Sequence, residues 1–389
     1  MSTSDEAEKL AKKINKAAKI ILSAGMMPFP PTDTFIEILK FYLDEEDMDF
    51  IKAFKTKKSM TMEQLQKKLP DLSEDEIDKK AAKLAKKGFI FNQPSSSGLM
   101  VYRLLPIVAI GAFEYTYMPE LPKDEKELEK LRKLAKLYDT LMLELASAIQ
   151  ERYDSILPMF KQAPPIDRTI PIYTNEEGKT IEINKSMQAE EQVLPAQSVE
   201  EIIKKFDTIA VGNCFCRQYR EMLEEPCKID APMEVCFTFG KSAKHVIQQG
   251  FARKVSKEEA LEILKKTDEA GLVHKAFHNK SDIYKIENSI CNCCKCCCDT
   301  FNLWRMGATA MINSTNYLSQ VNKDTCTGCG TCEEKCPTGA ISVGSDNLAN
   351  VNEELCIGCG ICAHFCPEGA ISLKEGLRKV FVPPPRIKK

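Results

Sequence analysis

The stretch TCTGCGTCEEKCPTGAISV, residues 325–343, is followed by a second copy, LCIGCGICAHFCPEGAISL, residues 355–373. Each copy spaces its cysteines as C-x2-C-x2-C-x3-C and places a proline directly after the fourth. An iron–sulfur cube has iron at four corners, and a tight loop can direct three thiolates to three of them. The fourth cysteine lies about one helical turn away, and the proline changes the chain direction there, so its thiolate goes to the other cluster. The two copies therefore predict a pair of [4Fe–4S] clusters.

The expected ligands of the first cluster are Cys326, Cys329, Cys332 and Cys366, and those of the second are Cys336, Cys356, Cys359 and Cys362. Gly328, Gly330, Gly358 and Gly360 supply permissive backbone and leave N–H groups free to hydrogen-bond sulfur. Two alternatives are cysteines that only pack as small apolar side chains and a zinc site. A duplicated motif that keeps both prolines argues against both alternatives.

On these motifs, residues 321–373 resemble the bacterial two-[4Fe–4S] ferredoxin family, with every motif cysteine present. The resemblance implies two pseudo-symmetric halves whose clusters lie close enough for electrons to pass between them. The segment carries no arrangement of acid, base and nucleophile. We therefore interpret it as a conductor of electrons and not as a catalyst.

Composition places this segment in a long, nearly neutral chain of 389 residues with a formal charge of −2, so no overall basic field favours nucleic acid. All 18 cysteines lie between Cys214 and Cys366. The Lys-rich start lacks the apolar core of a signal peptide, and the longest apolar stretch, residues 99–113, is too short to span a bilayer. We expect a cytoplasmic protein without a transmembrane segment, whose cysteines serve as metal ligands in a reducing compartment.

Ten further cysteines precede the repeats, and we expect them to be metal ligands. They are Cys214, Cys216, Cys227, Cys236, Cys291, Cys293, Cys294, Cys296, Cys297 and Cys298. Six of them fall within residues 291–298, where unligated thiols would invite oxidation. All-cysteine sites suit both zinc and iron, and the neighbouring repeats favour iron–sulfur. Two cubanes need eight cysteines and leave two spare, so the sequence predicts one or two further clusters without assigning their ligands.

A helix over 291–298 would place Cys291, Cys294 and Cys298 on one face and Cys293 with Cys297 on another. One segment could then feed two clusters, and spare thiolates could bridge irons or face a substrate. Arg217, Arg220 and Lys228 lie near these cysteines in sequence and could offset cluster charge, or they could be ordinary surface charges. For His245, His274 and His278 a surface or core position is the preferred interpretation over metal ligation or proton transfer.

The central region also resembles a family of uncharacterised 4Fe–4S-binding proteins. The resemblance rests on a CxCR element at residues 214–217, an SKEEALEIL-like helix, a CNCCxCCC run at residues 291–298, and the repeats that follow. It covers roughly residues 190–373. It implies an anaerobic redox protein and supplies no reaction.

Residues 32–106 predict the order helix, helix, helix, hairpin, which resembles a winged helix-turn-helix domain. A DNA-reading helix would begin with basic and amide side chains, whereas this third helix begins SEDE at residues 73–76. A protein-interaction or structural role is therefore preferred to DNA binding. Residues 5–22 predict an amphipathic helix that packs on the body, with a membrane-surface anchor as the weaker alternative. Residues 123–152 predict a long helix with an apolar stripe.

These patterns predict an α+β multidomain protein. Its expected parts are an N-terminal helix and linker (1–31), a winged-helix-like domain (32–120), a long helix and linker (121–195), a cysteine-rich iron–sulfur α/β domain (196–320), a two-[4Fe–4S] ferredoxin domain (321–375) and a tail (376–389). The expected function is electron relay to a partner redox protein. The alternatives are a reductase with an unusual or open-site cluster at the central cysteines, and an iron–sulfur redox sensor that binds DNA.

Overall fold

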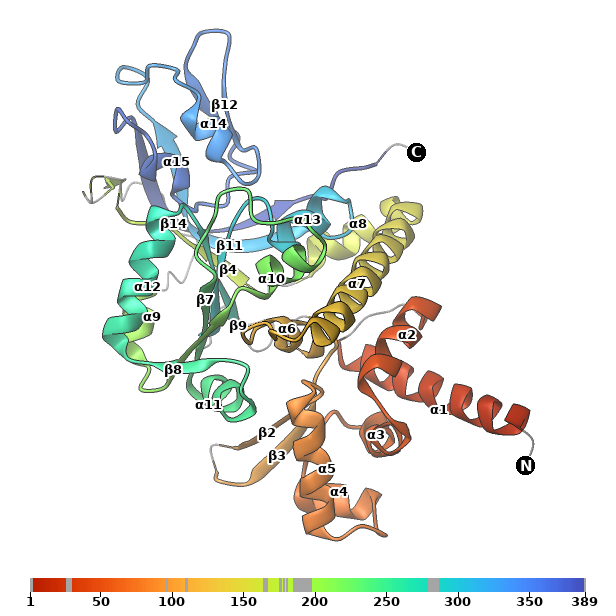
Figure 1. Cartoon of the computed structure of the whole chain (residues 1–389). Coiled ribbons are helices and arrows are strands. Elements are labelled where there is room, and N and C mark those ends of the chain that lie inside the picture. Colours follow the sequence, from red (N-terminus) through yellow and green to blue (C-terminus); the bar gives the residue numbers. More distant parts are fainter. Residues whose placement is uncertain are drawn as a thin grey trace. The chain divides into compact units, whose positions relative to one another are not determined.

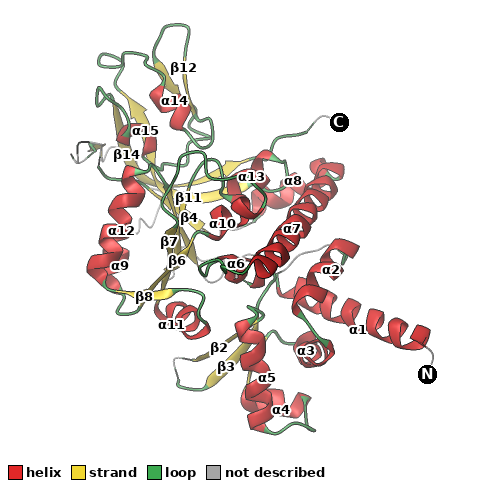
Figure 2. Ribbon diagram, viewed as in Figure 1, coloured by secondary structure: helices red, strands yellow, loops and turns green. Residues whose placement is uncertain are grey.

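A computed structural model describes residues 3–25, 30–95, 97–108, 111–163, 167–174, 177, 179, 181–184, 198–278 and 287–387. The chain divides into two compact units. The first comprises residues 1–141 and 244–253, and the second comprises residues 142–243 and 254–389. As expected, helices and strands are mixed throughout (Figures 1 and 2).

The first unit is mainly helical and contains a small sheet. Its elements are α1 (Thr3–Ala24), α2 (Asp33–Tyr42), α3 (Glu45–Ile51), a 3-10 turn η1 (Lys52–Lys55), β1 (Ser59–Thr61), α4 (Met62–Lys68), α5 (Glu74–Lys86), β2 (Ile90–Pro94), β3 (Met100–Leu104) and α6 (Ala112–Tyr117). The long helix α7 (Glu125–Glu151) begins in this unit and ends in the second. The predicted helices and hairpin between residues 32 and 106 are all present.

Capping residues explain where these helices begin. Thr61 caps α4, and Ser73 caps α5 in a capping box with Glu76, in which each side chain bonds the other residue's backbone N–H. The three strands form an antiparallel sheet in the order β1-β3-β2. Exposed acidic side chains occupy the first turn of α5, at Glu74, Asp75 and Glu76.

The apolar face of α1 is buried within this unit, where Ile14, Ala17 and Ile21 pack with α2 and α3. Lys13 on the same helix forms ion pairs with Glu45 and Asp49. In the part of the chain that the structure describes, no helix combines the length and the apolar character needed to cross a membrane.

The second unit is built on a nine-stranded sheet. Its strands are β4 (Asp167–Ile170), β5 (Ile183–Asn184), β6 (Ile209–Asn213), β7 (Glu234–Phe239), β8 (Arg253–Val255), β9 (Val273–His278), β10 (Glu287–Cys293), β11 (Met311–Val321) and β14 (Ile371–Val382). A separate hairpin comprises β12 (Ile341–Val343) and β13 (Ala349–Val351). Helices of this unit are α8 (Tyr153–Gln162), α9 (Val199–Lys205), α10 (Phe215–Met222), α12 (Lys257–Glu269), α13 (Asp299–Arg305), α14 (Thr331–Lys335) and α15 (Ile361–His364). Helix α11 (Gly240–Gln249) begins in this unit and ends in the first.

The strand order is β5-β14-β11-β4-β9-β10-β7-β6-β8. β11 and β14 pair antiparallel along their whole length, from Met311 opposite Val382 to Val321 opposite Ile371. The two cysteine repeats lie between these strands, so the sheet holds both ends of the repeat segment. β14 crosses the boundary predicted at residue 375 and carries the chain to Val382.

Apolar side chains of α9 and α12 cover one region of the sheet, and Figure 1 shows these two helices side by side. Ile202, Ile203 and Leu264 from the helices pack there with Phe237 and Ile290 from the strands. Helix α9 is followed by β6, and β6 leads directly into Cys214.

Candidate metal centres

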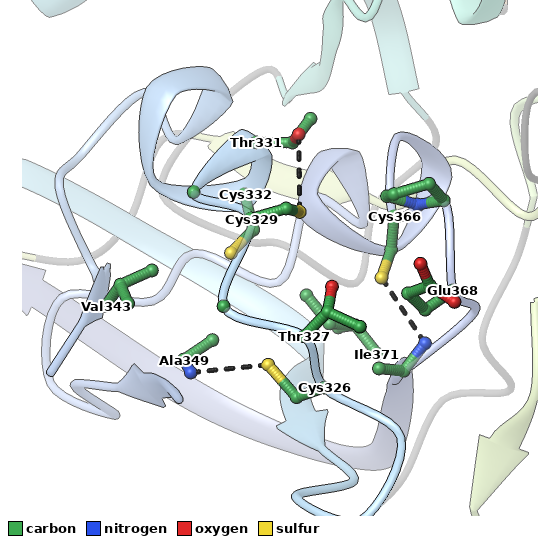
Figure 3. Close-up of a pocket in the computed structure, with 14 residues that line it drawn as sticks. Cys326, Thr327, Cys329, Thr331, Cys332, Val343, Ala349, Cys366, Glu368 and Ile371 are labelled. Carbon is green, nitrogen blue, oxygen red and sulfur yellow. Dashed lines mark hydrogen bonds between the residues drawn. The ribbon is translucent and has the colours of Figure 1, made fainter. Parts of the chain in front are cut away.

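The structure places the first predicted ligand set around one hollow. The four cysteines are Cys326, Cys329, Cys332 and Cys366, and the hollow holds about 340 Å³ of empty space, part of it open to solvent. Figure 3 shows their sulfur atoms together with the hydrogen bonds described next. The backbone N–H of Ala349 donates to Cys326 Sγ (3.5 Å), and that of Ala370 donates to Cys366 Sγ (3.3 Å). Cys329 is exposed, and its hydrogen bond with Thr331 lowers the pKa of the Cys329 thiol.

A second hollow of about 320 Å³ is lined by the second predicted set, Cys336, Cys356, Cys359 and Cys362. All four of these cysteines are buried. Ser319 of β11 lies between two of them, 3.2 Å from Cys362 Sγ and 3.8 Å from Cys356 Sγ. Burial raises the pKa of Cys362 to about 12, and the Ser319 hydrogen bond opposes that shift.

Both hollows fit a [4Fe–4S] cluster. Each offers four soft thiolate ligands, an almost wholly apolar lining, and backbone N–H groups directed at sulfur, the last being a known control on cluster potential. That the eight cysteines ligate clusters in these two sets remains a prediction.

The sheet makes the two repeats unequal in their surroundings. In the first cysteine loop, residues 326–334 are exposed or half-buried except for Cys332, whereas the equivalent residues of the second loop, 356–364, are buried throughout. β11 has a bulge between Thr315 and Tyr317, and the loop lies against it at Gly358. Arg378 of β14 donates to the carbonyl oxygens of Tyr317, Glu353 and Cys356, which fastens the loop to the bulge.

The ten upstream cysteines separate into two groups. In the first, the sulfur atoms of Cys227, Cys294, Cys296 and Cys297 all lie within 4.8 Å of one another. We call this the four-cysteine site. Among the described residues it is the only group of three or more potential ligands that lie so close together.

The remaining six cysteines form a continuous series of side-chain contacts, which we call the six-cysteine group. The series runs Cys214, Cys216, Cys298, Cys293, Cys291, Cys236. Hydrogen bonds from Cys216 and Cys293, with the charge of Lys275 nearby, lower the pKa of the Cys298 thiol. Since the thiolate is the form that binds metal, Cys298 is suited to ligation, whereas hydrogen bonds with neighbouring cysteines raise the pKa of Cys216, Cys291 and Cys293.

Two buried cations serve these groups. Arg217 is fully buried and donates to the carbonyl oxygens of Pro232 (2.7 Å) and Asn292 (2.9 Å). Burial opposes its charge, but Cys214 and Cys294 outweigh burial and raise the pKa of Arg217. Lys275 is also buried; its ion pair with Asp167 (3.0 Å) and the sulfurs of Cys293 and Cys298 outweigh burial and raise its pKa.

The helix considered for residues 291–298 is not present. Cys291 and Cys293 lie on strand β10, a turn follows, and Cys298 is the N-cap of α13. Pairing with β9 explains the strand, because Cys291 lies opposite Lys275 and Cys293 opposite Val273. The ligand faces expected from a helix are therefore wrong.

Charged and polar residues around the sites were only partly anticipated. The sequence analysis named Arg217, but it gave equal weight to two interpretations, a cation that offsets cluster charge and an ordinary surface charge. Nothing in the local sequence marked Lys275, Ser319 or Arg378, since each reaches its site through strand pairing. His274 is buried between Asn292 (2.6 Å) and Asp268 (2.8 Å), so it orients the strand that bears the cysteines.

His245 lies in the core of the first unit, among Phe91, Tyr115 and Phe251. Burial, with the charge of Arg103, lowers the pKa of His245 to about 4. The preferred core interpretation agrees with this position. The side chain of His278 lies outside the described residues.

Comparison with known proteins supports the C-terminal assignment. The family described as a 4Fe-4S dicluster domain matches residues 319–373. A probable ferredoxin of Methanosarcina thermophila is 48% identical over 31 residues, which cover 8% of this chain and 53% of that protein. The chain thus spans about half the length of this curated relative. No solved structure matches the chain. Residues 319–373 are therefore a ferredoxin-type iron–sulfur segment.

Equivalent glycines of the two repeats give a test of the unequal surroundings. Gly330 and Gly360 both have left-handed φ angles, of 82° and 75°, but a Cβ at Gly330 meets nothing within 4 Å. A Cβ at Gly360 would lie 2.7 Å from the carbonyl oxygen of Ile172. We expect Gly330→Ala to cost about 1 kcal/mol in backbone strain, and Gly360→Ala about 2 kcal/mol more from the added overlap.

The measurement is anaerobic urea unfolding of the iron-loaded chain, together with the rate at which each variant releases iron to a chelator. Gly360→Ala should unfold at lower urea concentration and release iron faster than Gly330→Ala. Equal behaviour of the two variants would contradict the close packing of the second loop on the sheet.

Proposed function

We propose that this chain is an electron-transfer protein that accepts electrons at the exposed first ferredoxin site and relays them inward to the central cysteines. The observation that carries this proposal is the difference in burial between the two ferredoxin sites, together with the position of the six-cysteine group next to the buried one. Cys329 of the first site is exposed, the second site is buried, and the six-cysteine group lies beyond it. The clustered thiols suit an oxygen-free cytoplasm.

Shared packing supports this order of sites. Cysteines of both ferredoxin sites belong to one apolar cluster, in which Cys332 and Cys336 pack with Leu318 and Leu373. Cys359 of the second site shares a different apolar cluster with Cys293 and Cys298 of the six-cysteine group. The second site therefore adjoins both of the others.

The protein's own residues would hold and tune the redox centres. Bound [4Fe–4S] clusters supply one-electron transfer. The cysteine thiolates would hold them, while Ser319 and the backbone N–H groups would hydrogen-bond those thiolates. Ile357, Ile361 and Phe301 exclude water between the second site and the six-cysteine group. Arg217 and Lys275 place positive charge where thiolates and a further cluster would concentrate negative charge.

The exposed site also favours a partner of particular charge. Asp324, Glu333, Glu334 and Glu368 are exposed around the first cysteine loop and its neighbouring helix. A redox partner with a basic surface would complement them.

Selective removal of one site tests the relay. We expect anaerobic wild-type protein to contain at least about eight irons and eight inorganic sulfides per chain. Cys329→Ala should lose about four of each. In this variant a protein donor should reduce the inner centres more slowly. The small reductant dithionite should still reduce them, because dithionite needs no docking site.

Cys359→Ala serves as the matched variant, because it removes the second site and keeps the first. The protein donor should still reduce its first site, while the central centre stays oxidised. Stopped-flow absorbance and EPR report both steps. Wild-type transfer from the protein donor in Cys329→Ala would refute the proposed entry point, and zinc in place of iron and sulfide would refute the relay as a whole.

A second candidate function is a reductase whose reaction takes place at the six-cysteine group. The observation that favours it is the number of thiols, because a cubane uses four and this group brings six together beside two buried cations. A further cluster of unusual ligation, with an iron open to substrate, would use such a set.

The reductase candidate predicts that a small ligand alters the EPR spectrum of one central cluster and leaves the ferredoxin signals unchanged. Cyanide and a simple alkyl disulfide are suitable probes, the first as an iron ligand and the second as a reducible substrate. Cys236→Ser, which changes the last cysteine of the series, should alter that spectrum. An unchanged spectrum with both probes would leave the relay as the function.

For the first unit, we propose a winged-helix-like domain that binds a protein partner. Its sheet order β1-β3-β2, with α3, α4 and α5, supports the comparison. The exposed acidic first turn of α5 would repel phosphates, which disfavours the DNA-binding sensor.

Duplex binding tests the role of this unit. We expect no salt-dependent binding to mixed-sequence DNA at low ionic strength, measured by fluorescence anisotropy with the full chain. Glu74→Lys/Asp75→Lys is a useful comparison, because reversing the charge of this turn should raise any weak affinity. Tight, salt-dependent binding by the wild type would restore the sensor.

A further inference from the structure

The four-cysteine site differs in scale from the two ferredoxin hollows. The sulfur of Cys227 lies 3.9 Å from that of Cys294 and 3.7 Å from that of Cys296. Cys296 and Cys297 are 3.6 Å apart at sulfur. The four sulfurs therefore form a small, closed set with no large hollow between them.

These separations match one metal ion and not a cubane. Four thiolates at about 2.3 Å from a tetrahedral zinc ion stand about 3.8 Å from one another. A cubane instead places four irons and four sulfides between its thiolates, which must stand farther apart. In the same protein, the ferredoxin cysteines surround hollows of about 340 and 320 Å³.

The surroundings of the sulfurs are also those of a metal–thiolate site. The backbone N–H of Cys297 donates to Cys294 Sγ (3.3 Å), across a C-x2-C turn of the kind used by zinc sites. The backbone of Lys228 hydrogen-bonds Cys296, and the Arg217 side chain hydrogen-bonds Cys294. Ala231 and Leu272 enclose the set in an apolar cluster of its own.

We propose that Cys227, Cys294, Cys296 and Cys297 bind a single tetrahedral metal ion, Zn²⁺ or Fe²⁺, without inorganic sulfide. This inference is independent of the relay, since it concerns four cysteines that neither ferredoxin site uses. It leaves the six-cysteine group as the place for any further cluster.

The position of the ion indicates what it would do for the fold. Cys227 lies in the loop after α10, and the other three ligands lie in the turn after β10. One ion would fasten that loop to that turn. Helix α10 carries Cys216 and begins at its N-cap, Cys214, so the ion would help to hold two members of the six-cysteine group.

The test compares metal and sulfide loss in anaerobically purified full-length variants. Cys227→Ala/Cys296→Ala should lose about one zinc or iron per chain and no sulfide. Cys329→Ala is the matched reference, because removal of a cubane ligand should cost about four irons and four sulfides. A loss of about four irons with sulfide from the double variant would overturn the proposal, and so would unchanged metal content.

X-ray absorption of the wild-type protein keeps the proposal testable if the double variant does not fold. If the ion is zinc, the extended fine structure above the zinc absorption edge should show about four sulfur neighbours at about 2.3 Å and no iron neighbour. If the ion is iron, Mössbauer spectra should contain one high-spin site of mononuclear Fe²⁺ outside the clusters. Absence of both signatures would refute a single-ion site.

Discussion

Close approach of backbone to backbone fixes the second cysteine loop on the sheet. A Cβ at Gly358 would lie 2.3 Å from both Thr315 Oγ1 and the carbonyl oxygen of Tyr317, so only glycine fits there. Its φ of +65° is also one that side-chain-bearing residues rarely adopt. The bulge in β11 makes this contact available, because it interrupts the ladder with β14 between Thr315 and Tyr317. Arg378 then joins the bulge to the loop from the neighbouring strand. Two repeats with the same cysteine spacing thereby acquire different surroundings, because the second cysteine loop is buried against the sheet and the first is largely exposed or half-buried.

Charge imposes a second constraint on the centre of the molecule. A buried guanidinium or ammonium group is costly unless it is paired and hydrogen-bonded. Arg217 donates to two carbonyl oxygens, and the negative groups that raise its pKa are cysteine thiolates. Lys275 has Asp167 together with two cysteines. The cations and the cysteines thus depend on one another. Without the cations, the thiolates and any bound cluster would have excess negative charge. Without the thiolates, the positive charges of Arg217 and Lys275 would be poorly neutralised.

The sequence predicted the local elements well, because these depend on short-range patterns, and the structure gathers each expected set of ferredoxin cysteines around one hollow. The helix expected to begin at residues 73–76 is α5, which Ser73 caps, and the cysteine spacing that recurs at residues 326–336 and 356–366 indicated the two repeats. Long-range strand pairing was not predictable in the same way. Nothing in residues 311–321 or 371–382 indicates that they pair with each other and join a nine-stranded sheet. Lys275 and Ser319 were consequently missed as site residues, since each is placed by the neighbour of its strand and not by its own sequence context.

The run CNCCKCCC shows why cysteine spacing does not reveal how many metal atoms a site holds. Side chains two residues apart on a strand share a face, so Cys291 and Cys293 point together as long as β10 continues. The strand ends at Cys293, and the turn that follows directs Cys294, Cys296 and Cys297 toward Cys227. Cys298 then begins α13 and rejoins Cys216 and Cys293. The point where the strand ends therefore divides the run between two sites, and that point is set by pairing with β9. Arg217 interacts with Cys214 on one side and Cys294 on the other, so a change of charge in either site acts on the same buried cation.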